Sequence, residues 1–314
     1  MKILVIELSN IGDSILTYPA LAGLWRAYPD AECHVLASPR SIDLFKGDPR
    51  IRQVWIWEKR ASLFQQIALI GKLFSLRFDL VVDFRHSAIP LFLLGARRTP
   101  LVRQRAVGVQ HRGDQHQGLL DSLGIPRADG AAPIWFGPDE EARVSRWIEP
   151  GRRPIAVAPG SRSHLKRWSA RGFAEVADRL IADARAQVLL VGDGQERAVA
   201  DQVKAAMRNS PTDLTGFTTI RDLAALLKKA ELLITNDSAC LHAAEAMGTP
   251  AVALFGPTDE RKYGPRHPRS TVVRRHLVCA PCERALCPYH HECMKWIEPD
   301  EVYAAAVKIL DSVD

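Results

Sequence analysis

The sequence lacks any apolar run long enough to cross a lipid bilayer. A transmembrane helix needs about 20 mostly apolar residues, and the longest candidate is the short stretch 89–96. The apolar run 3–6 follows Lys2, but it is too short for the apolar region of a signal peptide, and no small-residue cleavage site accompanies it. These absences predict a cytoplasmic protein.

Aromatic residues are scarce, at 7% of the chain, and the stretch 86–113 lacks the interleaved aromatic and basic residues of surfaces that stack nucleic-acid bases. Acidic residues are absent from His86 to Gly113. The same stretch contains Arg97, Arg98, Arg103, Arg105 and Arg112. It is either a solvated basic loop or a patch that pairs with carboxylates or phosphates of an anionic acceptor. The net charge of +6 fits acidic substrates or an anionic membrane surface, although solubility alone accounts for it.

Cysteine is sparse over most of the chain, where Cys33 and Cys240 stand alone, but a cluster of four reads C-x2-C-x4-C-x5-C. Disulfides are not expected in a reducing compartment. Four thiolates this close suit a structural Zn²⁺ or iron ion, with His290 and His291 as substitute ligands. Unpaired or redox-labile thiols remain the alternative, because the spacings match no common zinc finger. The predicted metal ligands are Cys279, Cys282, Cys287 and Cys293.

Length and periodicity predict two α/β domains. The chain has 314 residues, of which 47% are apolar, enough for two cores. Expected strands lie at 2–7, 34–37, 54–57, 80–83, 155–158, 188–191, 232–234 and 251–255. Expected helices lie at 63–76, 173–181, 197–207, 223–230 and 299–310. This alternation predicts parallel sheets covered on both faces. With a linker at 149–154, we predict Rossmann-like domains at 1–151 and 152–314 facing across a cleft.

The stretch from Leu232 to Thr258 carries the clearest ligand signal. An apolar strand leads into the capping side chains of residues 235–238, and Gly248 stands where a helix-ending glycine is expected. A helix that begins directly after a strand presents backbone N–H groups and its positive dipole end, which together stabilise a phosphate. A capped helix without a ligand is the alternative reading.

A second loop of this kind, PGSRSHLKRW at 159–168, follows the first strand of the second half. Gly160 permits close backbone approach, Ser161 can donate to a phosphate oxygen, and Lys166 offers a positive charge. The G-x-x-x-x-G-K-[ST] spacing of a Walker loop is absent. Trp168 is expected in the core rather than against a ligand.

Acidic side chains follow two further strands. Asp13 lies in the turn after the first strand, at the sheet edge where open α/β folds bind ligands, with a helix N-cap as its alternative role. Glu196 follows the strand 188–191 and is the candidate to accept hydrogen bonds from a ribose hydroxyl, a task that Asp193 could also fill.

Three segments resemble the ADP-heptose:lipopolysaccharide heptosyltransferases, glycosyltransferase family 9, whose fold is GT-B. They are KILVIELSNIGD at 2–13, PGSRSHLKRW at 159–168 and TNDSACLHAAEAMGTPAVALFGP at 235–257. The resemblance runs through most of the chain and implies that Asp13 is the catalytic base, Lys166 contacts the donor phosphates and Asp237 touches the donor sugar. The implied donor-binding residues are Gly160, Ser161, Lys166, Glu196, Asn236, Asp237, Ser238, Ala239 and His242. Expected at the acceptor are Gly12, Arg97, Arg98 and Arg103.

The implied reaction is an inverting transfer of heptose from ADP-heptose to the anionic inner core of lipopolysaccharide, in the cytoplasm or peripherally at the inner membrane. It needs one general base and fixed positive charge for the departing diphosphate, as Asp13 and Lys166 would supply. The chain contains no Asp-x-Asp, so we expect catalysis without a metal cofactor. The alternatives are another nucleotide sugar or acceptor, a non-catalytic nucleotide-sugar-binding or metal-sensing protein, and an epimerase or hydrolase. No nucleic-acid partner is expected.

Overall fold

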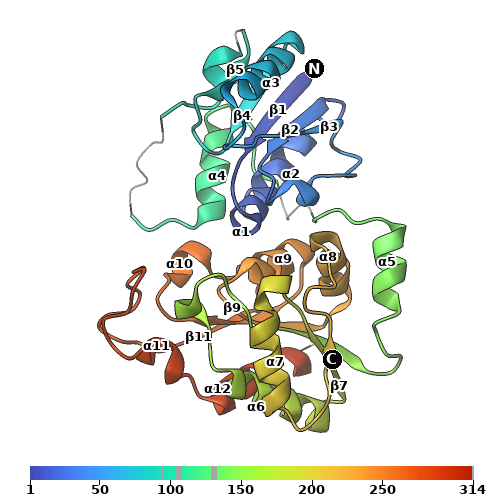
Figure 1. Cartoon of the computed structure of the whole chain (residues 1–314), viewed down its shortest axis with the longest axis vertical. Coiled ribbons are helices and arrows are strands. Elements are labelled where there is room, and N and C mark those ends of the chain that lie inside the picture. Colours follow the sequence, from blue (N-terminus) through green and yellow to red (C-terminus); the bar gives the residue numbers. More distant parts are fainter. Residues whose placement is uncertain (94, 103–107, 129–132, 313–314) are drawn as a thin grey trace. The chain divides into compact units, whose positions relative to one another are not determined.

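The computed structural model describes residues 1–93, 95–102, 108–128 and 133–312. The chain divides into two compact units, Met1–Trp135 and Phe136–Asp314, each built on one parallel sheet (Figure 1). The predicted fold of two Rossmann-like α/β units is confirmed. The division lies before the expected linker at 149–154, because helix α5 (Pro138–Ser145) packs on α8 (Ile220–Lys229) of the second unit. There Arg143 lies 2.7 Å from the buried carboxylate of Asp222.

The first unit has a five-stranded sheet in the order β3-β2-β1-β4-β5. Its strands are β1 (Lys2–Glu7), β2 (Glu32–Ala37), β3 (Gln53–Ile56), β4 (Leu80–Asp83) and β5 (Arg97–Arg98). Its helices are α1 (Ile11–Ile15), α2 (Tyr18–Ala27), η1 (Ile42–Leu44), α3 (Leu63–Ser75), η2 (Ile89–Phe92) and α4 (Arg112–Asp121), where η denotes a 3-10 helix.

The central strand β1 is buried along almost its whole length, as expected for a parallel strand covered on both faces. It pairs with β2 on one side and β4 on the other, with Ile3 opposite Cys33 and Leu80. The chain winds outward from β1 in both directions, so β1 and β4 form the point where the strand order reverses. Ligands bind at the carboxyl ends of strands at such a point, which here brings together the segments after Glu7 and Asp83.

The second unit has a six-stranded sheet in the order β11-β10-β9-β6-β7-β8. Its strands are β6 (Arg153–Ala158), β7 (Ala186–Leu190), β8 (Thr212–Asp213), β9 (Leu232–Asn236), β10 (Ala251–Phe255) and β11 (Thr271–Arg274). Its remaining helices are η3 (His164–Lys166), α6 (Ala170–Asp183), η4 (Gly194–Glu196), α7 (Arg197–Ala206), α9 (Ala239–Met247), α10 (Glu260–Tyr263), α11 (Glu292–Lys295) and α12 (Pro299–Asp311). The reversal point of this sheet lies between β6 and β9.

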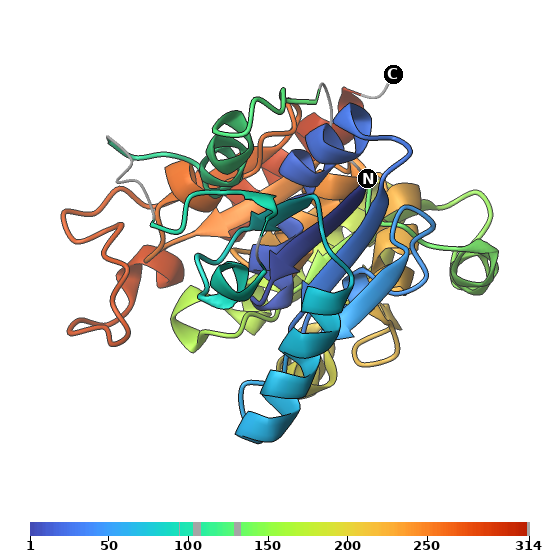
Figure 2. The same ribbon diagram turned by 90° about the horizontal axis from the view of Figure 1, so that it is seen from above.

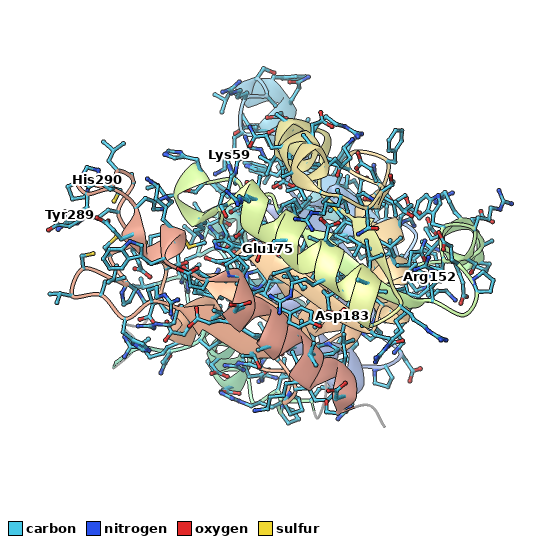
Figure 3. All side chains as sticks on the ribbon, turned by 90° about the horizontal axis from the view of Figure 1, so that it is seen from below. Lys59, Arg152, Glu175, Asp183, Tyr289 and His290 are labelled. Atoms are coloured by element: carbon cyan, nitrogen blue, oxygen red, sulfur yellow. The ribbon has the colours of Figure 1, made fainter. Side chains whose placement is uncertain are left out.

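Helices α6 and α12 lie side by side over one face of this sheet (Figure 3). Trp168 is buried beneath them, edge-on to Phe173 with ring centroids 5.1 Å apart, and its indole N–H donates to the carbonyl of Ile297 at 3.0 Å. The expected core role of Trp168 is confirmed. Gly248 ends α9 in the left-handed conformation, φ 74°, which glycine adopts at little cost.

Across the described parts of the chain, no helix has both the length and the apolarity needed to span a membrane.

Candidate functional site

In the second unit, the loop after β6 and the end of β9 bring a lysine and an aspartate together. Lys166 Nζ lies 2.6 Å from Asp237 Oδ2. The Asp237 side chain is only 5% exposed, so its charge depends on this partner, because an unpaired buried carboxylate is strongly disfavoured. The Lys166 side chain is 28% exposed. Its ammonium group therefore pairs with the buried carboxylate and still reaches solvent at the reversal point of the sheet.

Asn236 holds the loop 159–168 in place. Its amide nitrogen donates to the carbonyl of Pro159 at 2.8 Å, and its amide oxygen accepts from the N–H of Trp168 at 3.0 Å. Ser161, also buried, donates from Oγ to the carbonyl of Asp237 at 3.2 Å. These bonds connect the two ends of the loop to β9, so they fix the position from which Lys166 reaches Asp237.

Glu196 lies against two glycines at the ends of β6 and β7. A Cβ atom on Gly160 would stand 2.2 Å from the Glu196 carboxyl carbon, and one on Gly192 would stand 2.8 Å from Oε2. Glycine at both positions therefore makes room for the carboxylate. The N–H of Asp193 donates to Glu196 Oε2 at 3.1 Å. Burial raises the pKa of Glu196, and the charge of Asp193 raises it further.

Helix α9 begins directly beyond β9, and its N-cap residue does not satisfy the first turn. Ser238 makes no side-chain cap bond, and its Oγ lies 3.1 Å from Thr235 Oγ1 instead. The first N–H groups of a helix have no intrahelical acceptor and, with the helix dipole, form an anion site. Ala239 opens this helix, and the predicted donor-contacting His242 is buried within it.

In the first unit, Asp13 and Gly12 lie half-buried in the short helix α1, beyond the end of β1. The carboxylate that ends β1, Glu7, is fully buried. Its Oε1 accepts from the N–H of Ser9 at 2.8 Å, while Oε2 has no partner among the described residues. Burial raises the pKa of Glu7, and the neighbouring charge of Asp13 raises it further. This second carboxyl group beside Asp13 was not predicted from the sequence, although its place at a strand end could have indicated it.

His116 on α4 also belongs to this region and had no signal in the sequence. Its Nδ1 lies 3.1 Å from the carbonyl of Leu16, and its ring packs edge-on to Phe84 with centroids 5.5 Å apart. Burial lowers the pKa of His116 to about 4, and the charges of Arg112 and Arg85 lower it further, while Asp13 acts in the opposite direction. His116 is therefore neutral at physiological pH and donates from Nδ1 to the carbonyl.

The low pKa of His116 predicts a loss of stability in acid. In the unfolded chain His116 has a pKa near 6.5, whereas in the folded chain it stays neutral down to about pH 4. Between these two values the unfolded state binds more protons, so the free energy of unfolding falls as the pH drops from 6.5 to 4. The expected contribution is about 3 kcal/mol. Chemical denaturation of wild type and His116→Asn across this range tests it, since asparagine keeps a donor but does not titrate. The free energy of unfolding of the wild type, minus that of His116→Asn, should increase as the pH rises from 4 to 6.5. A difference that stays constant across this range would contradict the assignment.

The predicted acceptor-contacting arginines Arg97 and Arg98 form β5 at the edge of the first sheet. The guanidinium group of Arg97 donates to the carbonyl of Leu123, and that of Arg98 donates to the carbonyl of Pro90 at 3.0 Å. Both side chains thus help to hold neighbouring backbone segments. The third predicted residue, Arg103, lies outside the described residues.

The four cysteines predicted as metal ligands lie together in the segment between β11 and the end of α11. All of them line one cavity of about 280 Å³, yet among the described residues no three His, Cys, Asp or Glu side chains are placed to hold a metal ion. Cys293 packs into the core against Gly256, whereas Cys279 is exposed to solvent. Burial raises the pKa of Cys293 to about 11, and the neighbouring thiolates of Cys282, Cys287 and Cys279 raise it further. In Figure 3 the labelled Tyr289 and His290 mark the outer tip of this segment.

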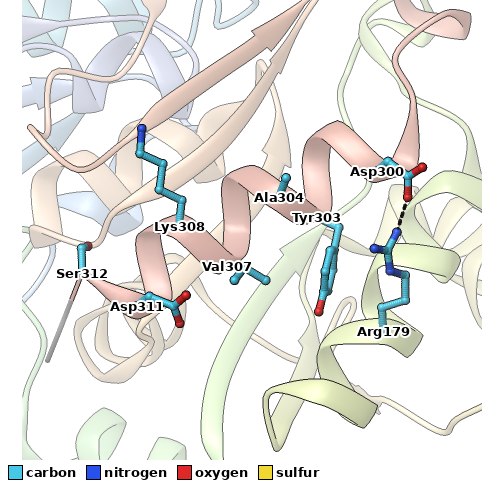
Figure 4. A pocket seen from close by; sticks show the side chains of 8 residues that line it. All are labelled: Arg179, Asp300, Tyr303, Ala304, Val307, Lys308, Asp311 and Ser312. Carbon is cyan, nitrogen blue, oxygen red and sulfur yellow. Dashed lines mark hydrogen bonds and ion pairs between the residues drawn. The ribbon is translucent and has the colours of Figure 1, made fainter.

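An open hollow along α12 is a packing feature rather than a ligand site (Figure 4). Its polar groups pair with one another: Arg179 lies 2.6 Å from Asp300 and stacks 3.8 Å above the ring of Tyr303. The Tyr303 hydroxyl donates to Asp183 at 2.7 Å. These contacts join α12 to α6 and leave the reversal point of the sheet as the better candidate site.

The chain matches one protein family, and its sequence and fold are similar to those of known heptosyltransferases. The model of glycosyltransferase family 9 (heptosyltransferase) matches residues 107–292, more than half of the chain. Lipooligosaccharide heptosyltransferase 2 of Campylobacter jejuni is 26% identical over 322 residues, covering 99% of this chain and 98% of that protein. Lipopolysaccharide heptosyltransferase 3 of Escherichia coli is 29% identical over 285 residues, covering 81% and 83%. The structure of E. coli ADP-heptose lps heptosyltransferase II shares the fold, with a TM-score of 0.81 at 22% identity over 100% of both chains.

Proposed function

Because the chain belongs to glycosyltransferase family 9 (heptosyltransferase), we propose that it transfers a heptose from ADP-heptose to the inner core of lipopolysaccharide. The observation that carries this proposal is the Lys166–Asp237 pair beside the N-terminus of α9, at the reversal point of the second sheet. The names of the relatives support the choice of sugar and acceptor.

The second unit would bind the donor. Lys166 and the first N–H groups of α9 would contact the diphosphate, because both offer positive charge to the same anion. Gly160 makes room for the carboxylate of Glu196, which would accept hydrogen bonds from the ribose. Asp237 orients Lys166 and would contact the sugar. Ser161 and Asn236 act by positioning the loop that carries Lys166, and Ser238, Ala239 and His242 complete the proposed donor site on α9.

The first unit would supply the base. Asp13 would take the proton of the acceptor hydroxyl as its oxygen attacks the anomeric carbon of the heptose. The bond from that carbon to the phosphate oxygen breaks, ADP leaves with the electron pair, and the anomeric configuration inverts. The developing charge on ADP falls on Lys166 and the α9 amides, so no metal ion is required for this step. Gly12, Arg97 and Arg98 are the proposed contacts for the anionic acceptor, at the cytoplasmic face of the inner membrane.

A donor panel tests the function directly. Purified protein is given ADP-heptose, other ADP-sugars or UDP-sugars, with and without delipidated inner-core acceptor, and released nucleotide is measured. We expect ADP release from ADP-heptose only when acceptor is present, and an unchanged rate in EDTA. Equal release without acceptor would indicate a hydrolase, binding without release would indicate a non-catalytic protein, and a loss of rate in EDTA would contradict the metal-independent step.

A further inference from the structure

Helix α3 carries apolar side chains on the face that it turns away from its own unit. Seen from above, the helix extends past the strands of the first sheet (Figure 2). Leu69 and Leu73 point toward the core and, with the C-cap residue Leu76, pack in a cluster that includes Phe78 and residues within β1 and β4. These contacts lie in the second half of the helix, so the first half projects from the unit.

The outward face has its own apolar stripe. Leu63, Ile67, Ile70 and Phe74 follow one another at intervals of four, three and four residues, which places them on one side of a helix of about 3.6 residues per turn. Leu63 is 73% exposed, Ile67 58% and Phe74 50%, and Phe64 next to the stripe is 81% exposed. A helix that is apolar on nearly all sides is normally buried. We therefore expect a binding partner to cover the outward face of α3.

The charges around the stripe indicate what covers it. From Lys59 to Phe78 the chain has four basic residues and no acidic one, and the exposed Glu58 and Asp79 lie just outside this stretch. Lys59 and Arg60 precede the helix, Lys72 lies on it and Arg77 follows it, and all four are exposed. An apolar stripe bordered mainly by positive charge is typical of helices that lie in the surface of an anionic bilayer, where apolar side chains enter the acyl boundary and basic ones meet the headgroups.

We propose that α3 is a membrane-surface helix that binds the protein to bilayers containing anionic lipids. The stripe supplies apolar area, and the basic residues at 59, 60, 72 and 77 supply the preference for negative charge. Helix η2, which contacts α3, adds two more exposed apolar side chains, Leu91 and Phe92. The inference does not depend on the proposed reaction, because it rests on the surface of α3 alone.

Sedimentation with lipid vesicles tests the proposal without any substrate. Full-length protein is mixed with phosphatidylglycerol-containing vesicles or with pure phosphatidylcholine vesicles, and the bound fraction is measured. We expect binding to the anionic vesicles that weakens between 0.1 and 0.5 M NaCl, and much weaker binding to the neutral ones. The double variant Phe64→Gln/Ile67→Gln should lower the partition coefficient at least about tenfold, and Lys59→Gln/Arg60→Gln should lower it on anionic vesicles only.

The matched control is Leu286→Gln, which changes a side chain of the second unit that is as exposed, at 78%, as Phe64. It should bind vesicles like the wild type, and all variants should keep the wild-type melting temperature because the changed side chains are exposed. Equal binding by wild type and the Phe64→Gln/Ile67→Gln variant would overturn the proposal. So would a wild-type dimer in light scattering that this variant converts to a monomer, since the stripe would then cover a second copy of the chain. If the protein binds anionic vesicles but releases no nucleotide in the donor panel, this inference holds and the proposed reaction does not.

Discussion

Replacing Asp13 by asparagine should lower kcat about a thousandfold while the affinity for ADP-heptose stays within about twofold of wild type. Asparagine keeps the size of the side chain and cannot accept the proton of the acceptor hydroxyl. In the proposal, Asp13 acts on the acceptor, whereas the donor is bound by the second unit, so binding and turnover should separate. Titration calorimetry with ADP-heptose and single-turnover kinetics with acceptor measure the two quantities independently.

The control for this variant is Asp43→Asn, which removes an exposed carboxylate of the same unit that is paired with Lys46 at 3.1 Å. Surface pairs of this kind contribute little to stability, so turnover and melting temperature should both match the wild type. Retained turnover in Asp13→Asn would remove the base assignment. A loss of donor affinity equal to the loss of turnover would show that Asp13 contributes to donor binding instead.

Replacing Lys166 by methionine should weaken ADP-heptose binding by about tenfold to a hundredfold, because a charge-assisted contact to the diphosphate is lost. The same change leaves the carboxylate of Asp237 buried without its partner at 2.6 Å. That should lower the free energy of unfolding by about 2 kcal/mol, less than for a fully buried pair because Lys166 is partly exposed. Calorimetry and urea denaturation measure the two effects.

The double variant Lys166→Met/Asp237→Asn separates stability from function. Removing the buried charge should restore most of the lost free energy of unfolding, while the diphosphate still lacks its ammonium group, so donor affinity should stay low. If the double variant recovered donor affinity together with stability, Lys166 would have a structural role only.

Much of the fold could be predicted because its strands are continuous apolar runs between Gly-containing turns. The strands β1, β4 and β10 have the predicted bounds, and α9 ends at the predicted glycine. The two-residue strands β5 and β8 are too short to show any periodicity. The division between the units lies before α5, which is joined to α8 by ion pairs such as Arg143–Asp222, and the Pro- and Gly-containing stretch 149–154 lies beyond that helix.

The site was predictable where residues follow a strand and unpredictable where tertiary packing decides. Lys166 and Asp237 each follow a strand, and neighbouring parallel strands brought them into contact. His116 reaches the region of Asp13 from α4, a hundred residues from its partner Leu16, and nothing local marks it. The cysteine spacing predicted a metal site, which stays a prediction, because the spacing does not fix the directions of the four side chains. Cys293 faces the core while Cys279 faces solvent.

The most direct test of the central claim is the stereochemistry of transfer. ADP-heptose of known anomeric configuration is incubated with the delipidated acceptor, and the one-bond C1–H1 coupling of the transferred heptose is measured by NMR. A single displacement assisted by Asp13 predicts a product of inverted configuration at that carbon. A product of retained configuration would contradict the proposal, because it would require a second displacement or a front-side attack in which Asp13 does not act as the base proposed here.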